Sequence, residues 1–175
     1  MTYMVPFDGS ALSEAALTKA RVHAIALEES RSDITQELHN GGPLEVVAVS
    51  VVPDSPHYAG EKGWLEEGEE FSTRRVVERL HEQVTGIDPS AAFQFERIDG
   101  AARAGGISQC LRRKADELGA SVVFIGSENA GRIVTPVTSV SAAVAADQDY
   151  DVFIVRRPLP QDVRSRLKSD FFVPG

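Results

Sequence analysis

Five segments typical of strands recur along the chain, and most of the stretches between them carry apolar residues at three- and four-residue steps. Four are short apolar runs, at residues 3–7, 44–52, 122–125 and 152–155, and the other, at residues 93–98, alternates between apolar and polar residues. Steps of three and four are typical of amphipathic helices, whereas short runs rich in β-branched residues are typical of buried strands. Strands that alternate with helices are joined by right-handed crossovers and lie parallel. The sequence therefore predicts an α/β fold with an open, five-stranded, mainly parallel sheet and helices on both faces.

The boundaries of the helices follow from caps and breakers. Ser10 can cap a first helix by accepting a backbone N–H hydrogen bond. Residues 53–63 hold two Pro and two Gly and predict a loop, after which Trp64 to Val84 is predicted to be a helix. A third helix is predicted around the apolar stripe that includes Cys110. A last helix is expected around Val140, before the fifth strand.

The length of the chain limits it to one domain. With 175 residues, of which 42% are hydrophobic, there is enough apolar material for one sizeable core. We expect a Rossmann-like domain over residues 1–157 and a C-terminal tail over residues 158–175. Because the tail carries several large apolar residues, we expect part of it to dock on its own domain or on a partner subunit.

The net charge and the cysteine content limit which binding partners and which cellular compartment we expect. A formal net charge of -8 disfavours nucleic acid and anionic membranes, because both prefer clustered Lys and Arg. The sequence has no long apolar run and no recognisable export signal, and its single cysteine, Cys110, excludes an internal disulfide. The four histidines lie in different elements without metal-ligand spacing, so no metal is predicted. We expect a cytoplasmic protein that binds neither nucleic acid nor membranes.

Polar residues at the predicted strand ends mark a candidate site. In open parallel sheets, ligands bind at the carboxyl ends of the strands where the strand order reverses. Asp8 follows the first strand and could accept hydrogen bonds from a ribose hydroxyl. The alternative is that Asp8 only holds its own turn through an Asx-type hydrogen bond.

A loop of small residues follows the fourth strand. Its backbone N–H groups and the side chains of Ser127 and Arg132 could bind an anion together with Thr138 and Ser139 at the start of the next helix. The alternative is a polar loop in which Thr138 or Ser139 caps that helix. A Walker-type phosphate loop is not supported, because Arg132 replaces the lysine and Ile133 stands where a Ser or Thr should hold magnesium.

Two segments together resemble the universal stress protein family. They are Met-Val-Pro-Phe-Asp-Gly-Ser at residues 4–10, followed by an Ala-rich helix, and Phe-Ile-Gly-Ser at residues 124–127, followed by Thr-Ser-Val at residues 138–140. The resemblance spans roughly residues 3–157 and implies a fold like that of adenine nucleotide alpha-hydrolases. In ATP-binding members, the aspartate of strand one and the residue after strand two contact the nucleoside, which implicates Asp8 and Val51. The resemblance implies a nucleotide site made of Pro6, Asp8, Val51, Gly126, Ser127, Asn129, Gly131, Arg132, Thr138, Ser139 and Val140.

The chain departs from the family's phosphate loop, G-x2-G-x9-G-(S/T). Gly126 matches the first glycine and Ser139 the final hydroxyl. Asn129 and Thr138 replace the other two glycines, and the stretch between them is one residue shorter. We therefore expect ATP to have little advantage over AMP or adenosine, unless Arg132 has taken over the role of the glycines.

The function predicted from the sequence is a universal stress protein-like binding module. It is expected to hold ATP, AMP or another small anionic ligand and to act in stress response through partner contacts. The resemblance also implies a homodimer that pairs through the last strand. Two alternatives remain at this point: an ATP-hydrolysing enzyme of the same fold, and an interaction protein whose cleft is filled by its own side chains.

Overall fold

Five parallel strands form one sheet in the order β3-β2-β1-β4-β5. The computed structural model describes residues 1–30, 44–100, 104–133, 150–162 and 165. The strands are β1 (Thr2–Pro6), β2 (Glu45–Pro53), β3 (Ala92–Ile98), β4 (Ala120–Gly126) and β5 (Asp151–Val155). All four strand pairings are parallel, so the predicted sheet is confirmed.

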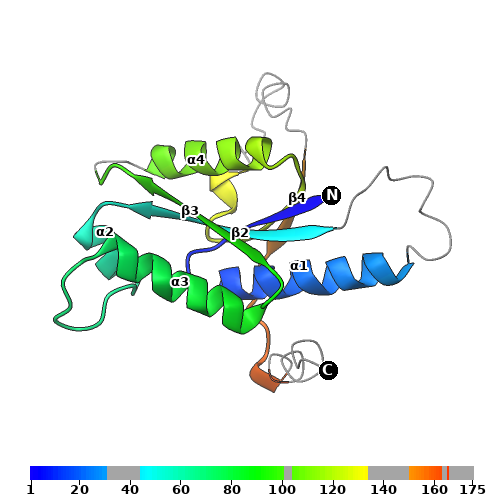
Figure 1. Cartoon of the computed structure of the whole chain (residues 1–175), viewed down its shortest axis with the longest axis horizontal. Coiled ribbons are helices and arrows are strands. Elements are labelled where there is room, and N and C mark those ends of the chain that lie inside the picture. The colour runs from blue at the N-terminus through cyan, green and yellow to red at the C-terminus, as the bar shows by residue number, and fades with distance from the viewer. Residues whose placement is uncertain (31–43, 101–103, 134–149, 163–164, 166–175) are drawn as a thin grey trace.

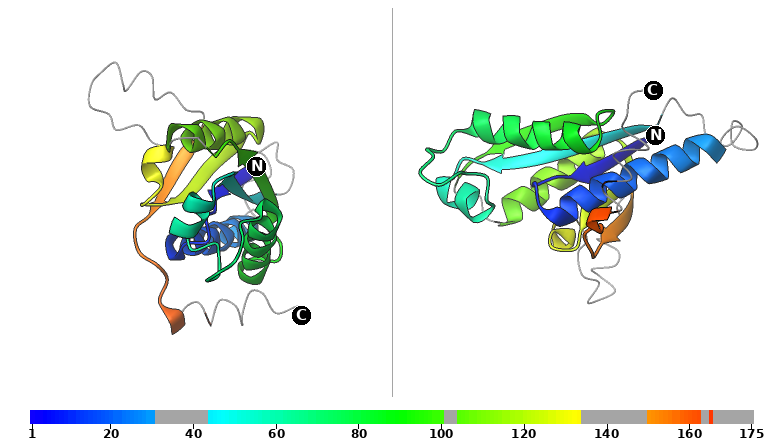
Figure 2. Two further views of the ribbon diagram at one scale, coloured as in Figure 1. Left: turned by 90° about the vertical axis from the view of Figure 1, so that its left-hand side faces the viewer. Right: turned by 90° about the horizontal axis from the view of Figure 1, so that it is seen from below.

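Helices cover both faces of this sheet, as predicted (Figure 1). Helices α1 (Ala11–Ser30) and α3 (Thr73–Ile87) lie on one face, and α4 (Ala104–Glu117) lies on the other. The end-on view shows the sheet between these two layers (Figure 2). Each layer has its own apolar cluster, so the sheet is buried between two cores.

Strand β1 lies at the centre of the sheet. Tyr3 and Val5 face the cluster under α1 and α3, whereas Met4 faces the cluster under α4. All three side chains are at most 1% exposed. A strand that is buried on both faces has no polar side to show, which explains the uninterrupted apolar run in the sequence.

The predicted helix over residues 64–84 is wrong in its first part. Helix α3 begins only at Thr73, and residues 64–72 form an irregular segment. Gly68 lies within it with φ +76°, a left-handed conformation that ends any helical repeat. The four glutamates of this segment resemble a solvated helix face in sequence, which misled the prediction.

The predicted loop over residues 53–63 contains a short helix, α2 (Pro56–Glu61). Ser55 caps it by accepting a hydrogen bond from the backbone N–H of Tyr58 at 3.2 Å. Pro56 opens its first turn, a position where the missing N–H costs nothing. The same residues that predicted a loop therefore start a helix.

The start of α1 and the C-terminal tail test two further predictions from the sequence. Ser10 caps α1 as predicted, because its hydroxyl accepts the backbone N–H of Ser13 at 3.2 Å. In the tail, Leu159 is half-buried against the core under α1 and α3, which agrees with the expected docking.

The helix predicted around Val140 lies outside the described residues. No helix in the described part of the chain has the length and apolar character needed to cross a membrane.

Candidate functional site

An open pocket lies at the carboxyl ends of β1, β2 and β4. From β1 the sheet extends to β2 and β3 on one side and to β4 and β5 on the other, so the strand order reverses between β1 and β4. The pocket encloses about 330 Å³, including the solvent at its mouth. Its lining is formed by Pro6, Phe7, Asp8, Val49, Val51, Tyr58, Ile107, Leu111, Asn129 and Arg132.

The lining of the pocket divides into an apolar wall and a polar side. The wall comes from β2, α2 and α4 and consists of Val49, Val51, Tyr58, Ile107 and Leu111. The polar side comes from the segments after β1 and β4 and consists of Asp8, Asn129 and Arg132. A mostly apolar cleft with a few convergent polar groups is the usual form of a small-molecule site.

The carboxylate of Asp8 is held by donors from three parts of the chain. Its Oδ1 accepts the backbone N–H of Ser10 at 3.0 Å. Its Oδ2 accepts the ammonium of Lys62 at 3.0 Å and the side-chain amide of Asn129 at 2.9 Å. Burial alone would raise the pKa of Asp8, but the hydrogen bonds from Ser10 and Asn129 and the charge of Lys62 outweigh it and hold the pKa well below its usual range. Asp8 is therefore ionised at any physiological pH.

The segment after α2 brings Lys62 to Asp8. Trp64 donates its indole N–H to the backbone carbonyl of Asp8 at 2.7 Å. Arg79 on α3 donates to the carbonyl of Trp64 at 2.9 Å and makes two hydrogen bonds of 2.7 Å to the carboxylate of Glu69. These hydrogen bonds hold the pKa of Glu69 at about 2. The irregular segment is thus tied to α3 at one end and to Asp8 at the other.

Asn129 and Arg132 come from the loop after β4. Arg132 donates from Nε to Oδ1 of Asn129 at 3.1 Å, and Asn129 donates from its amide to Asp8. Asn129 has φ −109°, and no non-glycine residue in the described part of the chain has a positive φ. The position that resembles the family's second glycine therefore does not need a glycine's backbone freedom in this chain.

Three described residues of the sequence-predicted site, Gly126, Ser127 and Gly131, lie apart from the pocket lining. Gly126 ends β4 beneath α1, where a Cβ would approach the Cβ of Leu12 to 2.8 Å, so its small size is needed for packing. Ser127 is exposed, and its backbone N–H bonds to the carbonyl of Val155 at 2.8 Å. Gly131 is exposed as well. The remaining three, Thr138, Ser139 and Val140, lie outside the described residues.

Several residues in the pocket lining or beside it were missed by the sequence reasoning. Tyr58 and Lys62 lie in a stretch that predicted only a loop, and no periodic pattern marked them. Ile107 and Leu111 were predicted as the inner face of a helix, which they are, but the same face also reaches the pocket. Among the described residues, no group of three or more His, Cys, Asp or Glu side chains could hold a metal ion.

No protein-family model matches the sequence, and a comparison with curated proteins gives no match either. Solved structures that resemble the chain include a universal stress protein family member from Burkholderia pseudomallei, with 20% identity, a TM-score of 0.42 and coverage of 90% of this chain and 96% of that one. Another is universal stress protein UspA from Lactobacillus plantarum, with 14% identity, a TM-score of 0.46 and coverage of 89% and 97%. A third is a universal stress protein from Archaeoglobus fulgidus, with 14% identity, a TM-score of 0.42 and coverage of 89% and 96%.

All three are universal stress proteins. The candidate site is defined by the contacts of this chain's own residues.

Proposed function

We propose that the chain is a universal stress protein-like binding module whose pocket holds an adenine nucleoside or nucleotide. One observation carries this proposal: the apolar wall, Asp8 and Arg132 line the same pocket. A nucleotide needs an apolar surface for its base, an acceptor for its ribose hydroxyls and cationic donors for its phosphate. The pocket offers all three within the carboxyl ends of adjacent strands.

Each part of the ligand has a matching part of the pocket. Val51 and Tyr58 offer apolar and aromatic surface against which a base can lie. Asp8 is ionised and accepts hydrogen bonds, which suits the ribose hydroxyls. Arg132 lines the pocket on the side of the loop after β4, where the resemblance to the family implies the phosphates of ATP or AMP.

Binding without turnover fits the chemistry of Asp8. A general base works best when its pKa is near the operating pH, and the pKa of Asp8 is held far below neutrality. A carboxylate of that kind accepts hydrogen bonds but is too weak a base to activate water. The alternative of an ATP-hydrolysing enzyme is tested by measuring phosphate release beside binding.

We further propose that the module acts in the cytoplasm, in stress response, as a homodimer that pairs through β5. Strand β5 is hydrogen-bonded to β4 on one side only and forms one edge of the sheet. Exposed Phe153 and Ile154 give this edge an apolar character that favours pairing with another strand. Partner proteins then bind to this dimer.

A release and titration experiment tests the nucleotide site. The native protein is purified, any retained small molecule is released and identified by mass, and adenosine, AMP and ATP are then titrated by calorimetry. Asp8→Asn removes the charge of the acceptor with little change of shape and should weaken binding of every ligand about tenfold or more. Glu78→Gln removes one negative charge from an exposed site on α3 and should leave binding unchanged.

One observation favours a second candidate, an interaction protein with a filled cleft. Oδ2 of Asp8 already accepts hydrogen bonds from Lys62 and Asn129, so side chains of the chain itself occupy the acceptor that a ribose would use. If the native protein retains no small molecule and binds none of the three ligands, this candidate replaces the nucleotide-binding module.

A further inference from the structure

Oδ2 of Asp8 has no hydrogen-bonding position left for a ligand. An ionised carboxylate has about four lone-pair sites, two on each oxygen. Oδ1 accepts the backbone N–H of Ser10 at 3.0 Å. Lys62 and Asn129 both bond to Oδ2, at 3.0 and 2.9 Å. A ribose hydroxyl can therefore bond to Oδ2 only after Lys62 or Asn129 has moved.

Lys62 is the donor that can move at the lowest cost. Ser10 is fixed by its position at the start of α1, where its carbonyl accepts the N–H of Glu14 at 3.0 Å. Asn129 is held from its other side by Arg132. Lys62 instead lies on a flexible four-carbon stem, its side chain is 25% exposed, and its ammonium also lies 5.7 Å from the centre of the Tyr58 ring.

The movement of Lys62 has a cost that depends on the charge of the ligand. An uncharged nucleoside replaces the ammonium at Asp8 with a hydroxyl and leaves Lys62 without an anionic partner. A nucleoside phosphate replaces the same bond and offers its own anion to the displaced ammonium. Lys62 contacts Asp8 beside the pocket, and Arg132 lines the pocket itself, so two cationic side chains near Asp8 favour an anionic ligand.

We propose that Lys62 is a specificity-determining residue of this pocket, which selects phosphorylated nucleosides over unphosphorylated ones. On ligand entry its ammonium passes from Asp8 to the phosphate of the ligand. Lys62 thereby supplies a phosphate contact in a chain where Asn129 and Thr138 replace two glycines of the family's phosphate loop. This inference rests on the proposed nucleotide-binding function.

The test compares AMP with adenosine, which differ only in the phosphate. Both are titrated by calorimetry into the wild-type protein and into Lys62→Met, Lys62→Arg and Arg74→Met variants. A charge-assisted hydrogen bond to phosphate predicts that the wild type binds AMP about tenfold or more tightly than adenosine, in contrast to the small difference expected from the phosphate-loop motif alone. In Lys62→Met this ratio should fall toward one, mainly because AMP binds more weakly while adenosine gains a free acceptor at Asp8.

Two control variants separate this effect from the general charge of the protein. Lys62→Arg keeps the cation and should keep the preference for AMP. Arg74→Met removes the same charge from a side chain that is 81% exposed on α3, and it should keep the preference as well. Near-ultraviolet circular dichroism of each variant checks that the fold around Trp64 is intact.

The two possible failures give different results. If the wild type binds adenosine and AMP and the Lys62→Met variant keeps the wild-type ratio, the role of Lys62 is wrong and the nucleotide-binding function stands. If the wild type binds both ligands equally, the inference is also wrong. If the wild type binds neither ligand, the nucleotide-binding function itself is wrong, and the inference falls with it.

Discussion

The side-chain amide of Asn129 donates a hydrogen bond of 2.9 Å to the carboxylate of Asp8, across the point where the strand order of the sheet reverses. Asp8 follows β1 and Asn129 follows β4, so this bond connects the two halves of the sheet at their carboxyl ends. Arg132 extends the connection by donating to the other end of the same amide. The loop after β4 is thus held by side chains at the position where the family pattern has a glycine.

Replacing Asn129 should weaken the fold measurably. Asn129→Ala removes a hydrogen bond to a charged group, and we expect the free energy of unfolding to fall by about 1.5 to 3 kcal/mol. Asn129→Asp keeps the shape but places a second carboxylate beside Asp8, so it should destabilise the protein more than Asn129→Ala at neutral pH. Urea unfolding at pH 7 measures both values. Equal stability of the wild type and Asn129→Ala would show that this bond contributes nothing.

Much of the fold was predictable because its signals are local. Short apolar runs and helical periods each depend on neighbouring residues, so all five strands were located within a few residues. Asp8 could be placed in the pocket for the same reason, since parallel strands end at one edge of the sheet, whereas Val51 was placed there by the resemblance to the family. The bond between Asn129 and Asp8 could not be predicted, because it joins side chains 121 positions apart.

The irregular segment before α3 shows where sequence reasoning fails. Its glutamates suggested a solvated helix face, but one of them, Glu69, accepts a hydrogen bond from Arg79. Trp64 lies outside any helix, and its indole N–H donates to the backbone carbonyl of Asp8. Such contacts depend on elements that meet only in the folded chain. Lys62 was missed because nothing in its own neighbourhood marks it as a partner of Asp8.

The ion pair between Asp8 and Lys62 predicts that the free energy of unfolding falls at acid pH. The pKa of Asp8 is lowered in the folded state, so its contribution is fully present above the ordinary aspartate pKa of about 4 and is lost as the pH falls toward the folded value. We expect the wild type to lose about 1 kcal/mol more than Asp8→Asn between pH 7 and pH 3, because only the part of the loss that lies between pH 3 and the unfolded pKa falls within this window. Urea unfolding at a series of pH values measures this difference. Parallel curves for the two proteins would contradict the prediction.

Cys110 should be unreactive in the folded protein. Its side chain is 3% exposed, and burial together with the neighbouring Glu96 raises the pKa of the thiol to about 12. Only the thiolate is nucleophilic, so a thiol reagent at pH 8 should react far more slowly with native protein than with protein in denaturant. Because the sequence has one cysteine, the native rate reports the exposure of Cys110 alone. A native rate equal to the denatured rate would show that the thiol is accessible.

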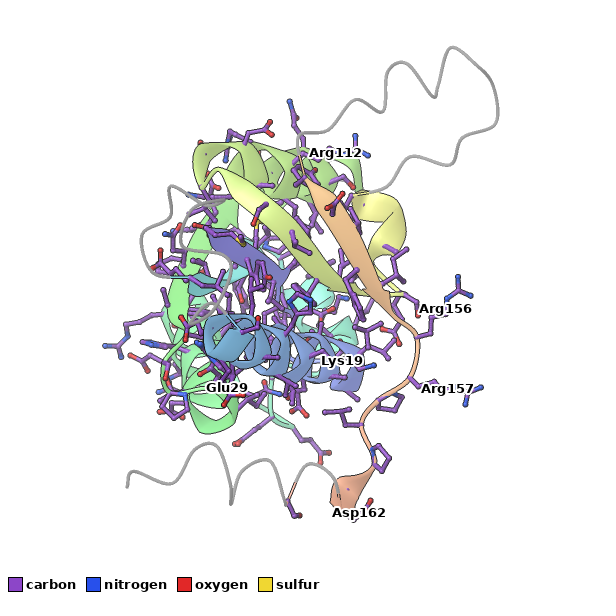
Figure 3. All side chains as sticks on the ribbon, turned by 90° about the vertical axis from the view of Figure 1, so that its right-hand side faces the viewer. Lys19, Glu29, Arg112, Arg156, Arg157 and Asp162 are labelled. Carbon is purple, nitrogen blue, oxygen red and sulfur yellow. The ribbon has the colours of Figure 1, made fainter. Side chains whose placement is uncertain are left out.

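The β5 edge predicts the oligomeric state and its disruption. Phe153 and Ile154 are 43% and 37% exposed, and Figure 3 shows this edge beside Lys19 of α1, with Arg156 and Arg157 extending outward from the chain that follows β5. Phe153 is partly held by stacking on Phe124, at 5.2 Å between ring centres, so Ile154 is the cleaner position to change. We expect a homodimer at micromolar concentration in sedimentation experiments. Ile154→Lys should weaken the dimer about tenfold or more, because a charge on an edge strand opposes pairing.

A matched variant on the other edge of the sheet decides which strand pairs. Phe95 is 50% exposed on β3, the opposite edge strand, so Phe95→Lys introduces the same charge at an equally apolar position. It should leave the dimer intact if the subunits pair through β5. Dissociation by Phe95→Lys but not by Ile154→Lys would move the interface to β3, and a wild-type monomer at micromolar concentration would exclude a dimer of either kind at that concentration.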